Sequence, residues 1–437
     1  MEIKGVSTDS RKIRQGELFV ALRGDRFDGH DFVLDAISNG ACGAVVERSV
    51  LESRYESLGK VRNLLPVEDT LFALQEMAHL HRQKFAVPVI GITGSNGKTT
   101  TKEMTASILK QKGPVLKNEG NLNNHIGVPL TLLKMEAVHR SAVVEMGMSA
   151  PGEIDLLARL VSPDIGVITN IGPAHLEFLG SMDGVAAAKA ELLDNLAAGG
   201  TAVLNADDRY FEALSDRFSG RVLSFGMNAG AAVRAQDIRQ GDDYTDFELV
   251  AQGAAARVRL RALGRHNISN ALAAAAAALA AGMAVEAVKY GLDDFTPVSM
   301  RSEVRVINGR TVLADYYNAN PGSVKAALET LVTLRPGARS VAVLGDMLEL
   351  GEQGAEEHRE IGRFAARLGV DVIIAVGELS ARILEGASDA GMPKSALFAA
   401  TSHAEAAGLL TRQSRIGDAV LIKGSRGMKM EKILEEF

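Results

Sequence analysis

The stretch "VPVIGITGSNGKTTTKEM", residues 87–104, combines an apolar run, three closely spaced glycines and, directly after the last glycine, Lys98. Glycines let the backbone bend close to a phosphate, so that several N–H groups can converge on it. The start of a following helix adds partial positive charge. Lys98 can then reach the outer phosphates of a nucleotide, and Thr99 can ligate Mg²⁺. The sequence predicts a nucleotide-binding loop formed by Gly94, Ser95, Asn96, Gly97, Lys98, Thr99 and Thr100.

The glycine spacing of this loop departs from the common phosphate-loop pattern G-x-x-x-x-G-K-[ST]. That pattern would place a glycine at position 92, where this chain has Ile92. A tight glycine turn without a ligand is the alternative, and the order of strand, turn and helix argues against it. Motor, GTPase and ligase functions remain open on this loop alone.

Three further side chains lie close to the ends of apolar runs. Glu145 ends "SAVVE", His175 follows "DIGVITNI", and Lys189 lies in the alanine-rich stretch "GVAAAKAELL". Ligands bind at the carboxyl edge of open parallel sheets, so we expect these side chains near Lys98. A carboxylate there can hold Mg²⁺. The alternatives are a solvated or capped loop glutamate, an exposed histidine and a surface lysine.

The elements that must position these residues are those of an α/β protein. The length of 437 residues suggests roughly three domains of about 150 residues each. Residues 1–83 alternate short apolar runs with helical periodicity, which predicts a small α/β unit with a helix over residues 71–85. Residues 84–297 predict a mostly parallel sheet covered on both faces, with an antiparallel excursion over 221–263 and a helix from Asn270.

Residues 298–437 repeat the pattern and predict a separate doubly wound, Rossmann-like domain. Strands are expected in the central section at "AVPVIGIT", "SAVVEMG", "DIGVITNI" and "TAVLNAD", and in the last section at "TVLADYY", "RSVAVLG", "VDVIIAVG" and "DAVLIKG".

Composition excludes several classes of protein. The net charge of −6 argues against a nucleic-acid binder, which usually carries a basic face. The single cysteine, Cys42, rules out an internal disulfide and a cysteine metal cluster, and fits the cytoplasm. The N-terminus has no apolar core of signal-peptide length. The longest apolar run, residues 271–285, is mostly alanine and too short for a membrane span, so it predicts a closely packed buried helix.

Four segments together resemble the Mur ligase family: "GITGSNGKTT", "EMGMSAPGEI", "TNIGPAHLE" and "AKAEL". These enzymes are ATP-dependent amide-bond ligases of peptidoglycan precursor synthesis, and relatives add glutamates to folates. The glycine spacing noted above is the family's own. The resemblance implies that Glu145 and His175 bind magnesium and that Lys189 is carbamoylated.

Four longer matches resemble the family member that adds D-alanyl-D-alanine, and they extend the resemblance over almost the whole chain. It implies that ATP phosphorylates the terminal carboxylate of UDP-N-acetylmuramoyl-tripeptide and that the amine of the dipeptide then attacks. Tyr316 departs from the small residue that is common at its position. The chain also starts almost on "STDSR", which implies a trimmed N-terminal domain. The matches are "STDSRKIRQGELFVALRGDRFDGHDF", "ADYYNANPGSVKAAL", "AVLGDMLELGEQGAEEH" and "LIKGSRGMKMEKIL".

The resemblance also implies binding roles for single residues. In the first domain, Asp9, Ser10 and Arg11 would bind the UDP part of the substrate. The central domain would add Asn123 and Asn124 near the nucleotide, and His266, Asn267 and Asn270 at a helix start. In the third domain, Arg301 would meet phosphate, Asp315 ribose hydroxyls, and Asn318 and Asn320 the dipeptide. The alternatives are ordinary turns, polar loops, a helix N-cap at Asn267 and surface salt bridges.

The resemblance therefore implies a monomeric cytoplasmic ligase that uses ATP and Mg²⁺, with Lys98, His175 and Lys189 as its catalytic residues. A sister ligase that adds one amino acid, including the folate relatives, is the nearest alternative. A nucleotide-binding switch without catalysis is the alternative from another class. Such a switch would not need Glu145, His175 and Lys189 together.

Overall fold

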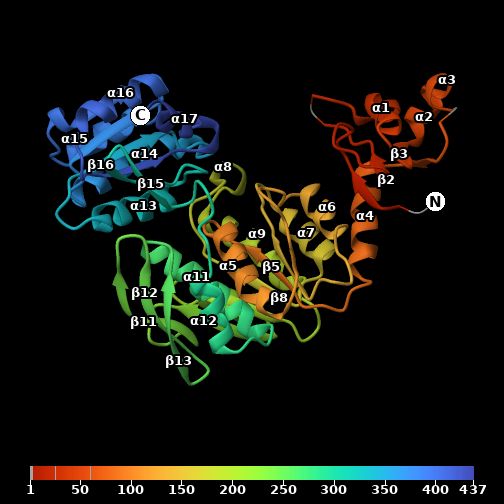
Figure 1. The fold of residues 1–437 in the computed structure, drawn as a ribbon, viewed down its shortest axis with the longest axis horizontal. Coiled ribbons are helices and arrows are strands. Elements are labelled where there is room, and N and C mark those ends of the chain that lie inside the picture. The colour runs from red at the N-terminus through yellow and green to blue at the C-terminus, as the bar shows by residue number, and fades with distance from the viewer. Residues whose placement is uncertain (1–2, 25, 60) are drawn as a thin grey trace.

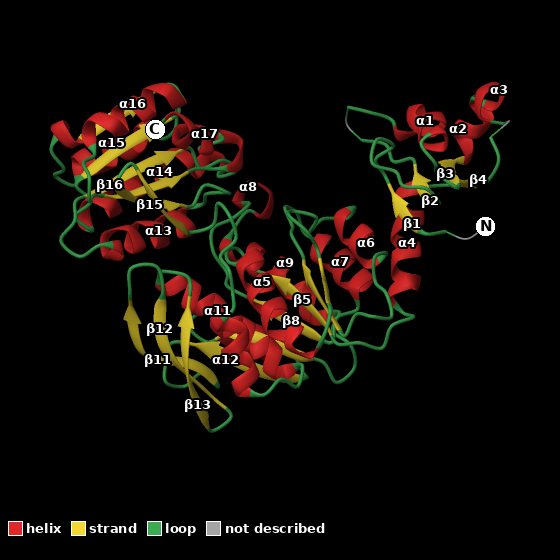
Figure 2. Cartoon of the chain, in the orientation of Figure 1, coloured by secondary structure: helices red, strands yellow, loops and turns green. Residues whose placement is uncertain are grey.

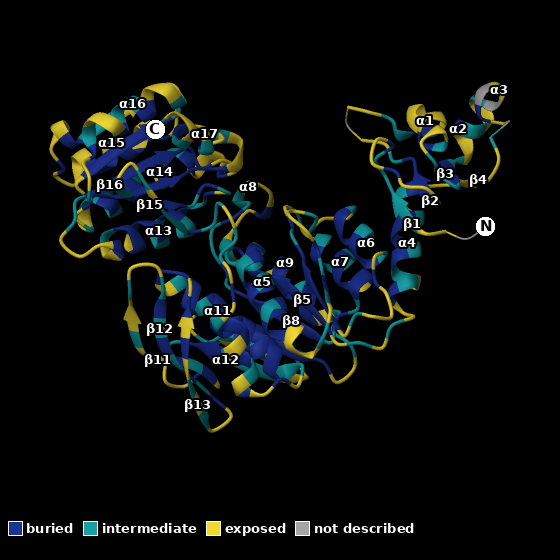
Figure 3. Ribbon diagram, in the orientation of Figure 1, coloured by how far each residue is buried: buried dark blue, intermediate teal, exposed yellow. Residues whose placement is uncertain are grey.

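The structure is a computed structural model that describes residues 3–24, 26–59 and 61–437 (Figure 1). Its strands form three sheets, which follow one another along the chain and have four, nine and six strands. Helices accompany each sheet (Figure 2), which confirms the expected α/β class. The inner strands of the two larger sheets are buried, and exposed residues gather on outer helices and loops (Figure 3). Within the described ranges, no helix has the length and apolar character needed to cross a membrane.

The first sheet is small and entirely parallel, in the order β1-β2-β3-β4. The chain leaves it through α4, which starts where Asp69 accepts a hydrogen bond from the Phe72 N–H. This helix packs against α6 and α7 of the next domain. The elements are β1 (Gly5–Ser7), β2 (Glu17–Val20), α1 (Val33–Ser38), β3 (Gly43–Glu47), α2 (Arg48–Ser53), α3 (Tyr55–Leu58), β4 (Leu64–Val67) and α4 (Thr70–Arg82).

Hydrogen bonds fasten α4 to carbonyl groups of the central domain. Gln75 Nε2 donates to the His125 carbonyl at 3.1 Å, and His81 Nε2 donates to that of Met135 at 2.9 Å. Arg82 Nε donates to the carbonyl of Val161 at 3.1 Å. The connection between the first two domains is therefore a docked helix rather than a free linker.

The central sheet has the order β13-β12-β11-β10-β9-β8-β5-β7-β6. The expectation that the antiparallel part starts at residue 221 is wrong, because β10 pairs in parallel with both β9 and β11. Antiparallel pairing begins only between β11 and β12. The strands are β5 (Val89–Thr93), β6 (Val115–Lys117), β7 (Ser141–Glu145), β8 (Ile165–Ile168), β9 (Thr201–Asn205), β10 (Arg221–Gly226), β11 (Val233–Gln240), β12 (Thr245–Ala251) and β13 (Ala254–Leu260).

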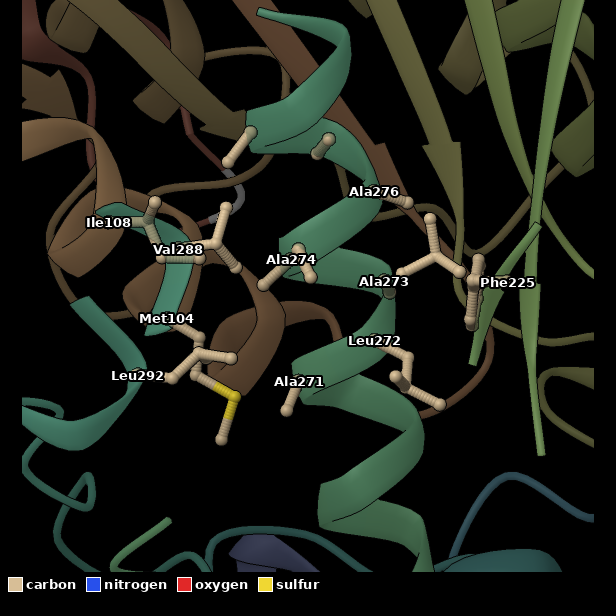
Figure 4. Close-up of a cluster of buried hydrophobic side chains, with 14 of the residues drawn as sticks. Met104, Ile108, Phe225, Ala271, Leu272, Ala273, Ala274, Ala276, Val288 and Leu292 are labelled. Carbon is tan, nitrogen blue, oxygen red and sulfur yellow. The ribbon is translucent and has the colours of Figure 1, made fainter. Parts of the chain in front are cut away.

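Helix α11 is the alanine-rich helix expected from the sequence, but it starts at Arg265 rather than at Asn270. Gly264 occupies its N-cap position, so the polar residues that follow belong to the first helical turns. Ala271 and residues 273–278 of this helix are fully buried between α5 and the sheet (Figure 4). The central helices are α5 (Lys98–Leu109), α6 (Gly127–Leu132), α7 (Glu153–Val161), α8 (Leu176–Leu179), α9 (Met182–Asp194), α10 (Phe211–Arg217), α11 (Arg265–Ala280) and α12 (Val285–Asp293).

The third sheet has the order β14-β15-β19-β16-β17-β18, with β14 as its antiparallel edge strand. The other pairs are parallel, as expected for a doubly wound domain. The elements are β14 (Glu303–Ile307), β15 (Arg310–Ala314), α13 (Pro321–Leu334), β16 (Ser340–Gly345), α14 (Gly354–Arg367), β17 (Val372–Val376), α15 (Ala381–Asp389), β18 (Leu397–Ala400), α16 (His403–Gln413), β19 (Ala419–Lys423) and α17 (Glu431–Glu436).

Candidate active site

The glycine-rich loop connects β5 to α5, as the sequence predicted. Gly94 and Gly97 have φ angles of 145° and 81°, which side chains rarely adopt. A Cβ at these positions would lie 1.9 Å from Thr169 Oγ1 and 2.0 Å from Asn270 Oδ1, respectively. Both positions therefore require glycine. Ile92, which occupies the place of the usual first glycine, is a fully buried residue of β5.

The loop is tied to the segment that follows β8. Thr169 Oγ1 donates to the Asn96 carbonyl at 2.6 Å, and the Asn96 N–H donates to Asn170 Oδ1 at 3.0 Å. Lys98 folds over the loop, with its Nζ 2.7 Å from the Gly94 carbonyl oxygen. Burial lowers the pKa of Lys98, and the charge of Glu145 opposes that shift. The lysine is thus held over the glycine-rich loop by one of the loop's own carbonyl groups.

Glu145 ends β7 and is buried, which excludes the solvated loop glutamate considered from the sequence. Thr99 Oγ1 donates to its Oε2 at 2.8 Å, and Asn123 Nδ2 donates to its Oε1 at 2.8 Å. Lys102 Nζ lies 3.7 Å from Oε2 and donates to the Asn118 carbonyl at 2.7 Å. Lys102 was not predicted. Its place one helical turn after Lys98, on the same face of α5, was the available signal.

His175 precedes α8 and has a left-handed backbone with φ 54°. Its Nδ1 is buried and forms no hydrogen bond of good geometry, although Glu349 Oε2 lies 2.9 Å away. Burial lowers the pKa of His175, and the charge of Glu349 opposes this. A buried ring nitrogen without a hydrogen bond is suited to accept a metal ion.

Lys189 lies within α9 and is only 2% exposed, which excludes the surface lysine. Burial, and then the nearby charge of Lys98, hold the pKa of Lys189 well below its ordinary value. The charge of Lys189 in turn lowers the pKa of His175. Lys189 is therefore close enough to Lys98 and His175 for their charges to interact, but unlike them it does not line the cavity described below.

Metal binding at the edge of the sheet where Glu145 lies would need oxygen ligands from outside the protein. In the described part of the chain, no three His, Cys, Asp or Glu side chains converge on one point. Magnesium is commonly held by one or two carboxylates together with substrate phosphates and water. Thr99 and Glu145, with the His175 nitrogen that now faces Glu349, fit a Mg²⁺ ion that shares its shell with a nucleotide.

The third domain faces the phosphate loop through the start of α13. Asn320 Nδ2 donates to Asn96 Oδ1 at 2.7 Å. Arg301 stacks on Tyr317, with its guanidinium carbon 3.8 Å from the ring centre. Lys423 was not singled out from the sequence, although it lies in the quoted segment "LIKGSRG".

The carboxylate of Asp315 accepts hydrogen bonds from residues of its own domain. Its Oδ2 accepts from the buried Lys423 Nζ at 2.6 Å, and its Oδ1 accepts from the Ser302 N–H at 2.9 Å. Burial raises the pKa of Asp315, but the charge and hydrogen bond of Lys423 more than offset this, and the net shift is downward.

Most of the predicted site residues line one cavity of about 940 Å³ between the central and third domains. Asn124 supports its wall by accepting two hydrogen bonds from N–H groups at the start of α6. Asn267 is no helix cap, since its Nδ2 donates to the Leu263 carbonyl at 2.8 Å. The predicted residues in the lining are Ser95, Asn96, Gly97, Lys98, Thr99, Thr100, Asn123, Asn124, Glu145, His175, His266, Asn267, Asn270, Arg301, Asp315, Asn318 and Asn320.

Asp9, Ser10 and Arg11 lie in the first domain and do not line this cavity. Arg11 Nε donates to Asp9 Oδ1 at 2.9 Å, and the Arg11 N–H donates to the same oxygen at 3.1 Å. Ser10 is buried, and its carbonyl accepts from Asn39 Nδ2. These contacts are those of a turn, and the three residues form no part of the cavity around Lys98.

Comparison with known proteins matches three family models along the chain. They are the Mur ligase family catalytic domain over residues 2–82, the Mur ligase middle domain over 92–278 and the Mur ligase glutamate ligase domain over 300–426. The chain belongs to the Mur ligase family. Two relatives named UDP-N-acetylmuramoyl-tripeptide–D-alanyl-D-alanine ligase span it almost fully. The Bacillus subtilis protein is 39% identical, covering 100% of this chain and 93% of the relative, and the Escherichia coli protein is 38% identical, covering 99% and 93%.

Solved structures give the same relationship for this Mur ligase. A crystal structure of MurF from Acinetobacter baumannii matches with a TM-score of 0.91 and 36% identity, covering 100% of this chain and 93% of the other. MurF ligase from Thermotoga maritima in complex with ADP matches with a TM-score of 0.88 and 30% identity, covering 99% and 96%. The family resemblance of the sequence segments is thereby confirmed.

Proposed function

We propose that this Mur ligase uses ATP to join D-alanyl-D-alanine to UDP-N-acetylmuramoyl-tripeptide, which yields the pentapeptide, ADP and phosphate. The observation that carries the proposal is one cavity that joins the phosphate loop, Glu145 and His175 to the third-domain residues Asn318 and Asn320. Relatives with this activity in their names align over nearly the full chain. We further propose that the enzyme works in the cytoplasm as a monomer.

The chemistry follows from the weakness of a carboxylate as an electrophile. Transfer of the γ-phosphoryl group of ATP to the terminal carboxylate oxygen gives an acyl phosphate and ADP. The neutral dipeptide amine then bonds to the acyl carbon and loses one proton, and the bond from that carbon to the phosphate oxygen breaks, which releases phosphate. No protein nucleophile is needed, so the protein mainly positions the reactants and neutralises charge. Lys98 and the loop N–H groups would bind the phosphates.

Magnesium, when bound, would neutralise charge on the transferring phosphate. Thr99, Glu145 and His175 are the residues proposed to hold it, together with a modified Lys189. A bare ammonium at Lys189 would repel the cation. The depressed pKa of Lys189 favours the neutral amine, which is the form that adds carbon dioxide. The resulting carbamate supplies anionic oxygen, which Mg²⁺ prefers.

Each domain would hold one part of the substrates. Residues 1–83 would bind the UDP moiety through Asp9, Ser10 and Arg11. Residues 84–297 would bind ATP, with Asn267 in contact with the nucleotide and Asn123 and Asn124 in contact with the substrate. Residues 298–437 would bind the dipeptide and close on ATP through Arg301 and Asp315. Closure would exclude water, which hydrolyses an acyl phosphate.

Phosphate release tests the proposal directly. It should depend on both UDP-N-acetylmuramoyl-tripeptide and D-alanyl-D-alanine. A sister ligase would accept a single amino acid instead of the dipeptide, and a nucleotide-binding switch would need neither substrate. Comparing tripeptides that end in diaminopimelate or in lysine would then define the natural acceptor.

A further inference from the structure

Glu349 stands on the third-domain wall of the cavity, in the loop that follows β16. Its Oε2 lies 2.9 Å from His175 Nδ1, which belongs to the central domain, and its side chain is 57% exposed. Both residues have left-handed backbones, with φ 65° at Glu349 and 54° at His175. Such a conformation costs a residue with a side chain roughly 1 kcal/mol or more. The local fold therefore holds this carboxylate toward the cavity in spite of strain.

The other acidic side chains that line the cavity are already engaged within the protein. Among the described residues, only Glu349 in this lining has a carboxylate whose one close partner is itself a proposed metal ligand. The engaged acids are Glu145, held by Thr99 and Asn123; Glu153, which accepts from the N–H groups of Ser149 and Ala150; and Asp315, held by Lys423 and Ser302. Because Glu145 is assigned to the metal ion, Glu349 is the lining acid left to meet a cationic group of a substrate once His175 has turned to the metal.

The charge of the cavity creates a need for such a group. Lys98 and Arg301 line it and suit the phosphates of a nucleotide, whereas the charge of Lys423 is already paired with Asp315. An incoming aliphatic amine is an ammonium ion near neutral pH, and these cations repel it. A carboxylate on the third-domain side offsets that repulsion close to the reacting centre and can fix the nitrogen by a charge-assisted hydrogen bond.

We propose that Glu349 binds the ammonium group of the incoming dipeptide and orients its nitrogen toward the acyl phosphate, and that the nitrogen attacks after releasing one proton to solvent. The inference rests on the proposed ligase function and assigns to Glu349 a substrate-binding role in it. When His175 binds a metal ion, it would no longer contact Glu349. The Glu349 carboxylate would then be available to bind the amine of the dipeptide.

The test separates amine binding from formation of the acyl phosphate. Glu349→Gln keeps the size of the side chain and removes its charge. We expect its KM for D-alanyl-D-alanine to rise about ten- to a hundredfold, the range for losing a hydrogen bond to a charged group. Hydroxylamine is largely uncharged at neutral pH and traps acyl phosphates as hydroxamates. The variant should therefore keep the hydroxamate formation of the unmutated enzyme with ATP and UDP-N-acetylmuramoyl-tripeptide.

Glu352→Gln is the matched control, because Glu352 is an exposed acid three positions away that does not line the cavity. Its KM for the dipeptide should stay unchanged. An unchanged KM in Glu349→Gln would overturn the proposal. So would a parallel loss of hydroxamate formation with weaker Mn²⁺ binding to the ATP complex, measured by electron paramagnetic resonance, since Glu349 would then act at the metal. Failure of the unmutated chain to make the pentapeptide would instead refute the proposed function itself.

Discussion

Asn320 Nδ2 and Asn96 Oδ1 form a 2.7 Å hydrogen bond that joins the start of α13 to the phosphate loop. Asn320 also caps α13, because its Oδ1 accepts from the Ser323 N–H and Ser323 Oγ accepts from the Asn320 N–H. One side chain therefore fixes both the helix and the contact between two domains. Its proposed contact with the dipeptide must share the side chain with these bonds.

Two substitutions at Asn320 separate its roles. Serine is a good N-cap but is too short to reach Asn96, so Asn320→Ser should keep the melting temperature and lower kcat several-fold. Asn320→Ala loses the cap as well and should unfold with about 1 kcal/mol less stability. Thermal denaturation and initial rates measure both effects.

The comparison variant is Asn318→Ala, which should raise KM for the dipeptide more than for ATP. Equal melting temperatures for all three variants would show that the cap contributes nothing.

Lys98→Ala should lower kcat by about a hundred- to a thousandfold, because it removes the one lysine folded over the phosphate loop. Circular dichroism should show an unchanged fold. Lys110→Ala is the control: Lys110 ends the same helical segment and forms only an exposed ion pair with Asp294. Near-normal turnover of a folded Lys98→Ala enzyme would refute the assignment of this loop.

Lys189→Ala should lose most activity, and acetate or another short carboxylic acid should partly restore it by filling the vacated space with an anion. Lys189→Arg should not recover, because it keeps a positive charge. Labelled bicarbonate should give a carbamate signal in ¹³C NMR of the unmutated enzyme and none in the alanine variant. Full activity of Lys189→Ala, with no carbamate signal, would rule the modification out.

His358 should make the protein less stable in mild acid. It is fully buried, its Nδ1 donates to the Gly354 carbonyl, and its Nε2 accepts from the Met347 N–H at 2.9 Å. Protonation would place an N–H group at Nε2, where it would face the N–H group of Met347, so that two hydrogen-bond donors would oppose each other. Burial lowers the pKa of His358, with the Gly354 hydrogen bond and the charges of Asp346 and Glu357 in opposition.

The unfolded chain therefore binds a proton more readily than the folded chain, so stability falls as the pH drops below about 6.5. One proton contributes a slope of at most about 1.4 kcal/mol per pH unit. Urea denaturation between pH 7.5 and 5.5 should show this decline, and His358→Gln, which can replace both hydrogen bonds, should reduce it. If stability declines equally with pH in the unmutated protein and in His358→Gln, the decline is due to groups other than His358.

Ala274→Leu should destabilise the protein by about 1–3 kcal/mol through overpacking. Ala274 is fully buried and lies on the side of α11 that faces Met104 and Ile108 of α5 (Figure 4). Displacement of α5 would also move Lys98, so KM for ATP should rise. Ala280→Leu, at the half-buried end of the same helix, should change both quantities little. Equal melting temperatures for the two variants would contradict close packing here.

The sequence was most informative where one property repeats along the chain. Continuous apolar runs located β5, β7 and β8, and a glycine spacing located the phosphate loop. Strands β14 and β18 escaped prediction because both are edge strands: β14 alternates with charged residues, and β18 is a short strand with only one buried residue, unlike the fully buried β8. Helix α11 was placed too late because Gly264, not an asparagine, precedes its first turn.

Contacts across domains could not be predicted, because no local pattern encodes them. The approach of Glu349 to His175 depends on how the third domain sits over the central one. Lys102 was overlooked for a related reason, since a lysine in a helix is usually solvated. The Asn118 carbonyl and the carboxylates of Glu103 and Glu145 surround its ammonium group, which accounts for its burial.

The docking of α4 onto the central domain has a consequence for substrate choice. Hydrogen bonds from Gln75, His81 and Arg82 hold the helix along its length and oppose movement of the first domain toward Lys98. If the first domain binds the nucleotide end of the substrate, the peptide end would then lie at a fixed distance from that domain. One peptide residue adds at most about 3.3–3.6 Å to that distance. The docked helix would thereby select substrates by peptide length. The terminal carboxylate of a peptide one residue too short would not reach the γ-phosphate of ATP.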